Sequence, residues 1–450
     1  MEQTFKIKKG LDLRLEGEAP RSMLSAGRPR SFAVQPDDFY GLPVRLSVKE
    51  GERVKAGSPL LCDKATETLL VTSPVSGTVR AIVRGERRKL LRIEIDADET
   101  QEYLDLGRLD PASATADEVR ALLLRSGLFA YLRQRPYDVV PSPTDTPKGI
   151  FVSAFSKMPL AADFSYVVSG REEDFKTGLQ LLSKLAPVAL GIRPEQEGAA
   201  FIPASGVKVY GFDGPNPSGN VGVQINHISP VNKGETAWTL GAEEVIFVGR
   251  TARTGRLDLT RRIALAGWGI ARPGYVETLP GAALSALLEG NLRGERKLRI
   301  IDGNPLVGRK SAAEGFLGAH TTEVCAIPEG DDVNEVLGWA APRLRDFSTS
   351  HSYFSWLLGK KRRYNLDCRI KGGERHIIMS GEYDRVFPMD IYAGYLIKAI
   401  IAGDIDRQEE LGIYEVAPED FAVAEFVDSS KLELQRIVRE GLDILRKENA

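Results

Sequence analysis

Cysteine and histidine are scarce in this chain of 450 residues, which contains three of the former and four of the latter. Cys62, Cys325 and Cys368 lie far apart and no C-x-x-C occurs, so we expect no local cysteine site for zinc or an iron–sulfur cluster. The odd, low count also favours a reducing compartment over a disulfide framework. The histidines are scattered, and we expect hydrogen-bonding residues rather than metal ligands. They are His227, His320, His351 and His376.

The chain also has no large excess of positive or negative charge and no long apolar run. The net charge is −2, which gives no overall field that would attract nucleic acid. The apolar segments are far shorter than the roughly 20 residues that cross a bilayer. The opening MEQTFKIKKGLDLRL has no apolar core of the signal-peptide kind. We therefore expect a soluble or peripheral protein without a nucleic-acid partner.

Familiar catalytic motifs are absent as well. The chain has no G-x-x-x-x-G-K-S/T, no H-E-x-x-H and no G-x-S-x-G, the signatures of P-loop, zinc-protease and hydrolase sites. GDIDRQEELG at 403–412 is rich in carboxylates but lacks calcium-loop spacing, so we expect a solvated turn and helix face. The sequence therefore predicts no catalytic residue and no metal ligand.

The residues that are present predict an α/β multidomain protein. Three patterns follow one another along the chain. They are alternating strands with glycine turns, then short apolar runs between helical segments, and then a strand pair around RPG followed by a short helix. The predicted parts are an N-terminal segment (1–35), a barrel (36–100), a Rossmann-like α/β domain (101–255), a β-grasp domain (256–330) and a C-terminal α-rich domain (331–450) with helices over 388–412 and 429–448.

The predicted barrel resembles a biotinyl/lipoyl domain in VKEGERVKAG and SPVSGTV. In carriers of that family a lysine at a hairpin tip bears the swinging arm, and Lys64 is the residue that resembles it. The intervals from Gly57 to Lys64 and from Lys64 to Ser73 are seven and nine residues, whereas carriers have the longer interval first. We expect an ordinary surface lysine, with a lipoyl-type carrier as the alternative.

The segment SGLFAYLRQRPYD at 126–138 lies where an α/β domain holds a phosphate or flavin. Such a loop needs glycines, so that backbone N–H groups approach the ligand closely. After Gly127 it has none and carries bulky side chains instead. The segment therefore predicts a loop with no room for a flavin phosphate.

The order of the parts, together with IKKGLDL, SPVSG, FDGPNPSG, FLGAH and EYDRVFPMDI, resembles the A-subunit family of the sodium-translocating NADH:quinone oxidoreductase. This resemblance covers essentially the whole chain. It implies a peripheral subunit on the cytoplasmic side of a bacterial inner membrane. The six-subunit complex would oxidise NADH, reduce ubiquinone or another quinone and pump sodium ions out of the cell (EC 7.2.1.1). The implied partners are the other subunits, chiefly the membrane-embedded B subunit.

Two related families, the C subunit of the Rnf pump and the flavin subunit of complex I, are electron carriers. Where they have a G-x-G-G-A-G-F-P flavin loop, this chain has FAYLRQRP; where they have N-x-(D/E)-E-x-E-P, it has SAFSKMP at 153–159. The cysteine clusters of the Rnf relative are replaced by VFPMDI and VAEFVDSS. The resemblance thus implies a ferredoxin-type C-terminal domain without cysteines and no cofactor in this chain. It implies FMN, riboflavin, FAD and iron–sulfur in the partner subunits.

Two surfaces are predicted from these departures. Aromatic rings and arginines of the 126–138 segment offer stacking and charge-assisted bonds to a quinone. These candidate residues are Phe129, Tyr131, Arg133, Arg135 and Tyr137. The alternative is that the rings fill the vacated cavity and the arginines pair with local acids such as Asp138. SYFSWLLGKKRRY at 352–364 predicts a partner or membrane surface, with a solvated basic turn as the alternative. Its candidate residues are Trp356, Lys360, Lys361, Arg362 and Arg363.

Three functions therefore compete. The first is a structural, cofactor-free subunit of a membrane redox pump that also contributes to a quinone site. The second is a diverged flavin or iron–sulfur oxidoreductase, and the third is a lipoyl-type carrier with a modified Lys64.

Overall fold

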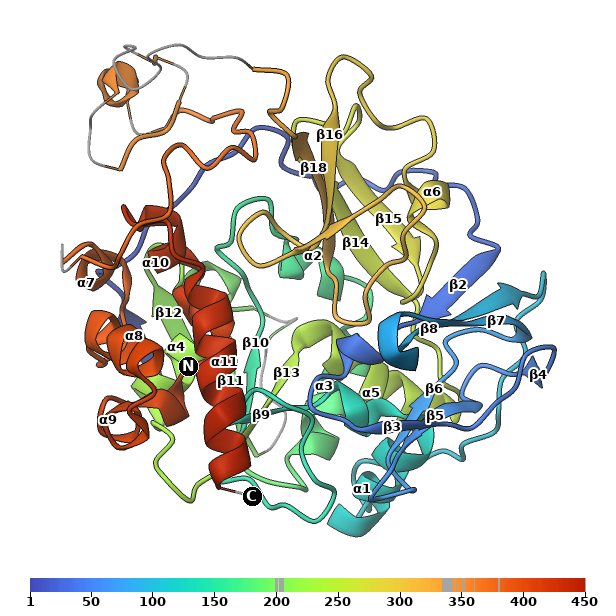
Figure 1. Cartoon of the computed structure of the whole chain (residues 1–450). Helices are drawn as coiled ribbons and strands as arrows, with labels where there is room; N and C mark the ends of the chain where they lie inside the picture. Colours follow the sequence, from blue (N-terminus) through green and yellow to red (C-terminus); the bar gives the residue numbers. More distant parts are fainter. Residues whose placement is uncertain are drawn as a thin grey trace.

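The computed structural model describes residues 1–198, 201, 206–333, 343–344, 346–349, 353–359, 361–378 and 381–449. Figure 1 shows a parallel sheet at the centre, with the C-terminal helices on its left, a strand-rich barrel on its right and a third group of strands above. The four parts pack around the carboxyl end of the central sheet.

The central sheet has six strands in the order β1-β12-β11-β10-β13-β9. Neighbouring strands are parallel, except that β9 runs antiparallel to β13. From β10 the chain proceeds to β11 and β12 on one side and then crosses to β13 on the other, so the strand order reverses between β10 and β13. The strands are β1 (Gln3–Lys6), β9 (Arg133–Arg135), β10 (Ile150–Ser153), β11 (Val188–Ile192), β12 (Val207–Asp213) and β13 (Ala237–Gly241).

Helices cover both faces of this sheet because its strands are apolar on both faces. On β10, Ile150 and Val152 join the large core that also contains residues of α1, α3 and α5, whereas Phe151 packs with Ile225 of α4 on the opposite face. The helices are α1 (Ala116–Ser126), α2 (Phe164–Val168), α3 (Glu172–Leu182), α4 (Val221–Ile228) and α5 (Ala242–Thr254).

Helices α3 and α5 approach unusually closely because each carries a glycine at the contact. A Cβ atom at Gly178 would lie 2.1 Å from the carbonyl oxygen of Val245. A Cβ atom at Gly249 would lie 1.8 Å from the carbonyl oxygen of Asp174. The two backbones therefore touch at positions that only glycine allows.

The barrel consists of two small sheets, with strand orders β2-β8-β7-β4 and β3-β5-β6. Lys64 is exposed and is the first residue after β5, whereas the turn toward β6 lies at 67–68. The lysine therefore stands off the hairpin tip, as its sequence spacing predicts. The strands are β2 (Ser31–Val34), β3 (Val44–Leu46), β4 (Arg53–Val54), β5 (Pro59–Asp63), β6 (Leu70–Thr72), β7 (Gly77–Arg84) and β8 (Leu90–Ala97).

A five-stranded sheet of order β15-β14-β18-β16-β17 forms the third part. The predicted strand pair around RPG is present as antiparallel β14 and β15, and the short helix α6 follows. The parallel partner of β14 is β18, which comes from the far end of the segment. The elements are β14 (Arg261–Ala266), β15 (Gly274–Thr278), α6 (Leu284–Leu287), β16 (Leu298–Asp302), β17 (Arg309–Ser311) and β18 (Glu323–Pro328).

The C-terminal part is helical and has its own core. That core also takes in Ile7, Phe155, Phe212 and Val223, so it is continuous with the α4 side of the central sheet. The helical prediction over 388–412 corresponds to α8 and α9, and that over 429–448 to α11. The elements are η7 (Phe354–Leu358), α7 (Glu382–Val386), α8 (Ala393–Ala402), α9 (Ile405–Glu410), η8 (Ile413–Glu415), η9 (Pro418–Phe421), α10 (Ala422–Val427) and α11 (Leu434–Glu448).

The predicted α/β multidomain class is confirmed by these sheets and helices. The N-terminal segment is divided between two of the parts, because β1 joins the edge of the central sheet beside β12, whereas β2 pairs with β8 in the barrel. Among the described residues, no helix combines the length and the apolar character that a membrane span needs.

Candidate functional site

A cavity of 790 Å³ opens at the carboxyl end of the central sheet. Ser153 at the end of β10 and Thr239 to Gly241 at the end of β13 form part of its wall. Open α/β sheets bind ligands where the strand order reverses, and the volume lies in the usual range of small-molecule sites. The position and size therefore mark this cavity as the candidate functional site.

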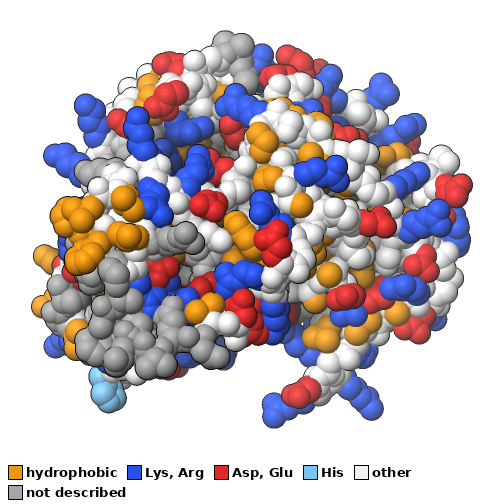
Figure 2. Space-filling view, turned by 90° about the horizontal axis from the view of Figure 1, so that it is seen from above, with side chains coloured by type: hydrophobic (Ala, Val, Ile, Leu, Met, Phe, Trp, Pro, Cys, Tyr) orange, Lys and Arg blue, Asp and Glu red, His pale blue; other side chains and the backbone are white. Residues whose placement is uncertain are grey.

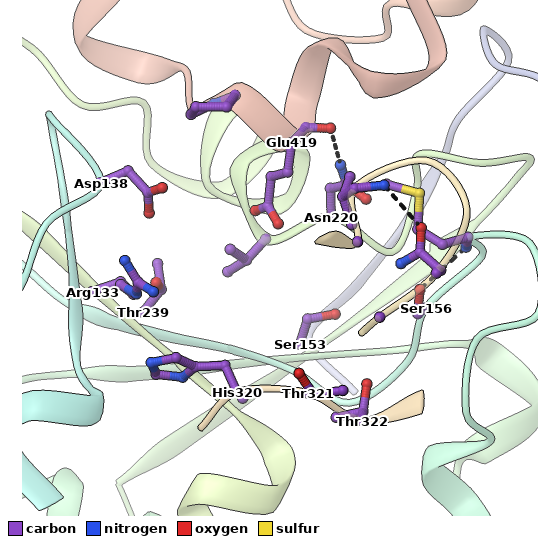
Figure 3. A pocket seen from close by; sticks show the side chains of 18 of the residues that line it. Arg133, Asp138, Ser153, Ser156, Asn220, Thr239, His320, Thr321, Thr322 and Glu419 are labelled. Carbon is purple, nitrogen blue, oxygen red and sulfur yellow. Dashed lines mark hydrogen bonds between the residues drawn. The ribbon is translucent and has the colours of Figure 1, made fainter. Parts of the chain in front are cut away.

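All four parts of the chain contribute to the lining of the cavity. Figure 3 shows Ser153, Thr239, His320, Thr321 and Thr322 on one side and Asp138, Glu419 and Asn220 on the other, with Arg133 beside Thr239. The lining also includes Asp38 and Tyr40 between β2 and β3 of the barrel, Asp302, Asn304, Arg309 and Glu323 of the third part, and Gln435 and Arg439 of α11.

The 126–138 segment reaches the cavity through a defined change of direction. A capping box between Thr115 and Glu118 begins α1, and Gly127 ends it with a φ of 78°, a value at which glycine avoids strain. The chain then makes one turn, η3 (Leu128–Tyr131), and enters β9. Because β9 pairs antiparallel with β13, Arg133 lies opposite Thr239 near the end of that strand, whereas Arg135 lies opposite Ala237, its first residue.

The bulky residues of this segment do not close the space at the end of the sheet, and the lack of room for a flavin phosphate stays a prediction. Phe129 is fully buried, and its ring packs edge-on against Trp238 at a centroid distance of 5.5 Å in the core. Tyr131 is also buried, but it lies at the cavity wall against His320, with ring centroids 5.2 Å apart. The Phe129 ring thus lies in the core, and the Tyr131 ring borders the cavity.

Three of the five predicted quinone residues line the cavity: Tyr131, Arg133 and Arg135. Phe129 is in the core, as described above. Tyr137 lies outside the lining, where its hydroxyl accepts a hydrogen bond from Asn449 Nδ2 at 3.2 Å. The structure therefore places both arginines and the Tyr131 ring at the cavity. The rings of Phe129 and Tyr137 lie outside its lining.

Arg135 is buried among carboxylates. Its Nη1 lies 3.2 Å from Asp138 Oδ1 and its Nη2 lies 3.1 Å from Glu419 Oε1, with Asp420 Oδ2 at 4.0 Å. The alternative that an arginine of this segment pairs with Asp138 is thus confirmed for Arg135. Arg133 is half-buried, and its Nη2 donates to the carbonyl oxygen of Asp38 at 2.9 Å.

The turn after β9 has a strained backbone. Tyr137 and Asp138 have φ values of 79° and 52°, which non-glycine residues seldom adopt. Arg439 of α11 holds the turn by donating Nη2 to the carbonyl oxygen of Tyr137 at 2.5 Å, and its guanidinium lies over the Tyr40 ring at 4.4 Å. Helix α11 thereby fixes the position of Asp138 at the cavity.

The carboxyl groups at the cavity have pKa values that move in opposite directions. Desolvation at the cavity wall, opposed by the Arg135 guanidinium, raises the pKa of Glu419 to about 7 although its side chain is 42% exposed, and Asp420 adds to the increase. Burial also acts on Asp138, but the guanidinium groups of Arg135, Arg133 and Arg439 hold its pKa below the usual range. The same wall therefore carries one carboxyl group near its midpoint at neutral pH and one that stays ionised.

A second cluster of titratable groups forms the opposite wall. Burial disfavours the Glu244 carboxylate, but His320 and Arg261 hold its pKa below the usual range. Burial raises the pKa of Glu323 even though Thr322 and Asn304 donate to its carboxylate. His320 Nε2 is buried without a hydrogen-bond partner among the described residues. This wall can therefore offer polar contacts to a ligand.

The site also contains residues from distant segments that the sequence does not predict, above all Asp38, His320, Glu419 and Arg439. His320 was expected to be an ordinary hydrogen-bonding residue. The only local signal is the polar run HTTE at 320–323, which leads into β18. Nothing near Glu419 in the sequence indicates that it approaches Arg135.

The predicted partner surface includes η7 and the basic residues after it. Exposed fractions are 54% for Phe354, 49% for Trp356, 63% for Leu357 and 51% for Leu358. Figure 1 shows this part at the upper left, standing out from the body, and Figure 2, which looks onto this end, shows apolar side chains gathered at the left edge beside basic ones.

The basic residues of this surface differ in their contacts. Lys361 is exposed, and the Arg362 guanidinium lies 5.7 Å from the Tyr364 ring. Arg363 pairs with Glu18 and donates to the carbonyl oxygen of Leu15 at 3.3 Å. Lys360 lies outside the described residues. Arg363 therefore anchors the segment to the N-terminal chain, whereas Lys361 is available to a partner.

Cys62 and Cys325 are buried, Cys368 is half-buried, and all three are free thiols. Within the described part of the chain, no three histidine, cysteine or carboxylate side chains come together in an arrangement that could hold a metal ion.

Protein-family models match three consecutive stretches of the chain. The NqrA N-terminal barrel-sandwich hybrid domain matches residues 5–98, the NqrA second alpha/beta domain matches 114–257, and the NQRA C-terminal domain matches 262–313. These stretches follow the order of the barrel, the central sheet and the third part of the fold.

Whole-length relatives carry one name, that of the A subunit of the Na(+)-translocating NADH-quinone reductase. The protein of Rhodopirellula baltica is 36% identical over 451 residues, covering 98% of both chains, and that of Pseudomonas aeruginosa is 36% identical over 448 residues, covering 99% of this chain and 100% of the relative. A solved NAD+-reducing NiFe-hydrogenase is 13% identical with a TM-score of 0.37, covering 77% of this chain and 72% of that one, a likeness too distant to bear on the function. The resemblance seen in the sequence is confirmed, and the chain belongs to the NqrA family, the A subunits of the Na+-translocating NADH-quinone reductase.

Proposed function

We propose that this chain is a cofactor-free subunit of a sodium-translocating NADH:quinone reductase, peripheral on the cytoplasmic side of the bacterial inner membrane. Its partners are the other subunits, chiefly the membrane-embedded B subunit, and these carry the flavins and iron–sulfur. The whole-length relationship to the NqrA proteins carries this proposal. In this view the central sheet is a Rossmann-like domain beside a β-grasp domain, and the C-terminal helices are a ferredoxin-type domain without cysteines.

Within this function, the cavity at the end of the central sheet accommodates a quinone ring. Tyr131 offers a flat wall, and offset or edge-on ring contacts contribute about 0.5–1.5 kcal/mol beyond burial of area. Arg133 offers guanidinium N–H groups, and charge-assisted bonds to oxygen are stronger than neutral ones. Arg135 is held by carboxylates, so its role is to position Asp138 and Glu419 at the wall.

The quinone proposal predicts saturable binding that depends on Arg133. We expect ubiquinone-1 to quench the intrinsic fluorescence of the full chain, and Arg133→Gln to weaken binding about tenfold, which corresponds to the roughly 1.4 kcal/mol expected for one lost charged contact. Arg253→Gln is the matched control, because Arg253 is a half-exposed arginine of α5 that pairs with Asp174 outside the cavity lining.

Equal affinities in the two variants, or no saturable binding in the unaltered chain, would place the quinone elsewhere in the complex. An absorbance band near 450 nm in the purified chain would instead assign the cavity to a flavin.

We further propose that the predicted surface at 352–364, which includes η7, meets a membrane partner or the membrane itself. Replacing Lys361 and Arg362 by glutamine and Trp356 by serine should weaken assembly with the membrane subunits at least tenfold. The physical reason is that apolar area is lost together with roughly 1 kcal/mol per basic residue near an anionic surface. Co-purification from membranes at low and raised salt measures this, with Arg436→Gln/Lys447→Gln on α11 as the matched control. Unchanged assembly of the triple variant would assign this segment to solvent.

A further inference from the structure

Glu419 reaches the cavity from the C-terminal part of the chain. It belongs to η9. Asn220, at the start of α4, holds η9 in place by donating Nδ2 to the Glu419 carbonyl oxygen at 3.1 Å. The side chain is 42% exposed, and the space it faces is the cavity. Figure 3 shows its carboxylate pointing into the cavity on the side of Asp138. A bound ligand can therefore touch this carboxyl group directly.

Glu419 shares its nearest guanidinium with two other acids. One guanidinium, that of Arg135, lies within 4.0 Å of three carboxylates, those of Asp138, Glu419 and Asp420. Asp138 has a second cation in Arg439, with Nη1 at 3.9 Å. Asp420 Oδ1 is buried without a hydrogen-bond partner in the described part of the chain. Ionising all three acids in this setting is unfavourable, because like charges at low dielectric repel strongly.

The charged and titratable groups that face Glu419 come from every element packed around it. Asp420 lies in η9 itself, and Arg439 comes from α11. Strand β9 contributes Arg133 and Arg135, and the turn after it contributes Asp138. Across the cavity stand His320, Glu244 and Glu323. Asp138 keeps two to three cations close to it, whereas Glu419 shares Arg135 with two other acids. A proton in this cluster therefore goes to Glu419 and its neighbour Asp420 before it goes to Asp138.

We propose that Glu419 couples ligand binding in the cavity to the uptake of one proton. The protonated carboxyl group donates its O–H to a carbonyl oxygen of a quinone-class ligand, while its other oxygen continues to accept from Arg135 Nη2. The proton comes from solvent, no electron moves in this step, and no covalent bond to carbon forms or breaks. This inference rests on the proposed quinone function of the cavity.

The expected signature is an affinity that rises as pH falls. With a midpoint near pH 7, roughly 90% of the molecules carry the Glu419 proton at pH 6 and roughly 10% at pH 8. Apparent affinity scales with the fraction of the competent form. The dissociation constant of ubiquinone-1 should therefore increase about tenfold from pH 6 to pH 8, and binding at pH 7 should take up about half a proton per ligand.

The test compares the full chain with Glu419→Gln and Glu415→Gln. The glutamine at 419 keeps a donor toward the cavity and an acceptor for Arg135 but has no proton to exchange. Glu415 on the adjacent η8 is the matched control, because burial raises its pKa as well, and its carboxylate accepts from Asn226 outside the cavity lining. Ubiquinone-1 titrations at pH 6, 7 and 8 give the affinities, a pH indicator in weak buffer gives the proton uptake, and near-UV circular dichroism confirms the fold of each variant.

We expect the affinity of Glu419→Gln to be independent of pH and within about threefold of the unaltered chain at pH 6, with no proton uptake, while Glu415→Gln keeps the tenfold dependence. Saturable binding whose pH dependence survives in Glu419→Gln overturns this inference and leaves the quinone proposal standing. Absence of saturable binding in the unaltered chain at every pH overturns both.

Discussion

Replacing Arg261 by methionine is expected to lower the free energy of unfolding by about 3–5 kcal/mol at pH 8, the usual cost of breaking a fully buried ion pair. Arg261 and Glu243 are both 0% exposed, and Arg261 Nε donates to Glu243 Oε2 at 2.7 Å. The same guanidinium donates to the carbonyl oxygen of Ala319 at 2.7 Å. The pair thus joins the first turn of α5 to β14. Methionine fills the space but removes the close cation of Glu243, whose remaining partners are the Arg262 backbone N–H at 3.0 Å and Arg171 Nη1 at 3.9 Å.

The loss should be smaller at pH 5 than at pH 8. Burial already raises the pKa of Glu243 in the presence of Arg261, and without the guanidinium the folded-state pKa must rise further. A raised folded-state pKa contributes stability that is present at low pH and is lost as pH increases. Urea unfolding of the full chain, followed by circular dichroism at both pH values, measures the difference.

The matched control for this variant is Arg53→Met. Arg53 makes a two-point contact with Asp98 at 2.9 and 3.0 Å, but its side chain is 62% exposed. Exposed ion pairs contribute at most about 1 kcal/mol. If Arg261→Met cost no more than Arg53→Met, the buried pair would not be the link between α5 and β14 that the geometry indicates.

Replacing Gly249 by alanine should destabilise the chain by about 3 kcal/mol. In a helix interior this change is ordinarily favourable by about 1 kcal/mol because alanine has the higher helix propensity. Here the added Cβ would lie 1.8 Å from the backbone oxygen of Asp174 and 2.7 Å from the backbone nitrogen of Gly178. Neither atom can move without shifting α3, and overpacking of this kind costs about 1–3 kcal/mol or more.

Thermal and urea unfolding test the sign of this change. Gly294→Ala is the control, since no atom lies within 4 Å of a Cβ placed there, and we expect a change within about 0.5 kcal/mol. A stabilised Gly249→Ala protein would contradict the close contact of α3 and α5.

Much of the fold could be predicted because its elements carry local signals. Each of these signals lies within a few consecutive residues. Examples are the capping box of α1, the short apolar runs of β10 to β13, and the RPG turn between β14 and β15. The pairing of β14 with β18 could not be read in this way, because the two strands are far apart in the sequence and no turn residue marks the connection.

The sequence predicts only those residues of the candidate site that lie close together in one segment. The α/β pattern places the segment of Arg133 and Arg135 at the sheet end, but it predicts a loop there, whereas pairing with β13 makes residues 133–135 the strand β9. The direction of Phe129 does not follow from this pattern, since it depends on Trp238 filling the core below β13. Glu419 and His320 reach the cavity through the packing of whole domains, for which a single sequence offers no periodic signal.

The edge strand β1 has a consequence for the order in which the chain is made. It pairs in parallel with β12, and Gln3 lies opposite Tyr210, so a ribosome must add roughly 200 residues before the first strand meets its partner. At about 5–20 residues per second this takes roughly 10–40 s. During that time the N-terminal strand has unpaired backbone groups that other strands can capture. Strand β1 is therefore exposed to capture for as long as the residues between β1 and β12 take to be made.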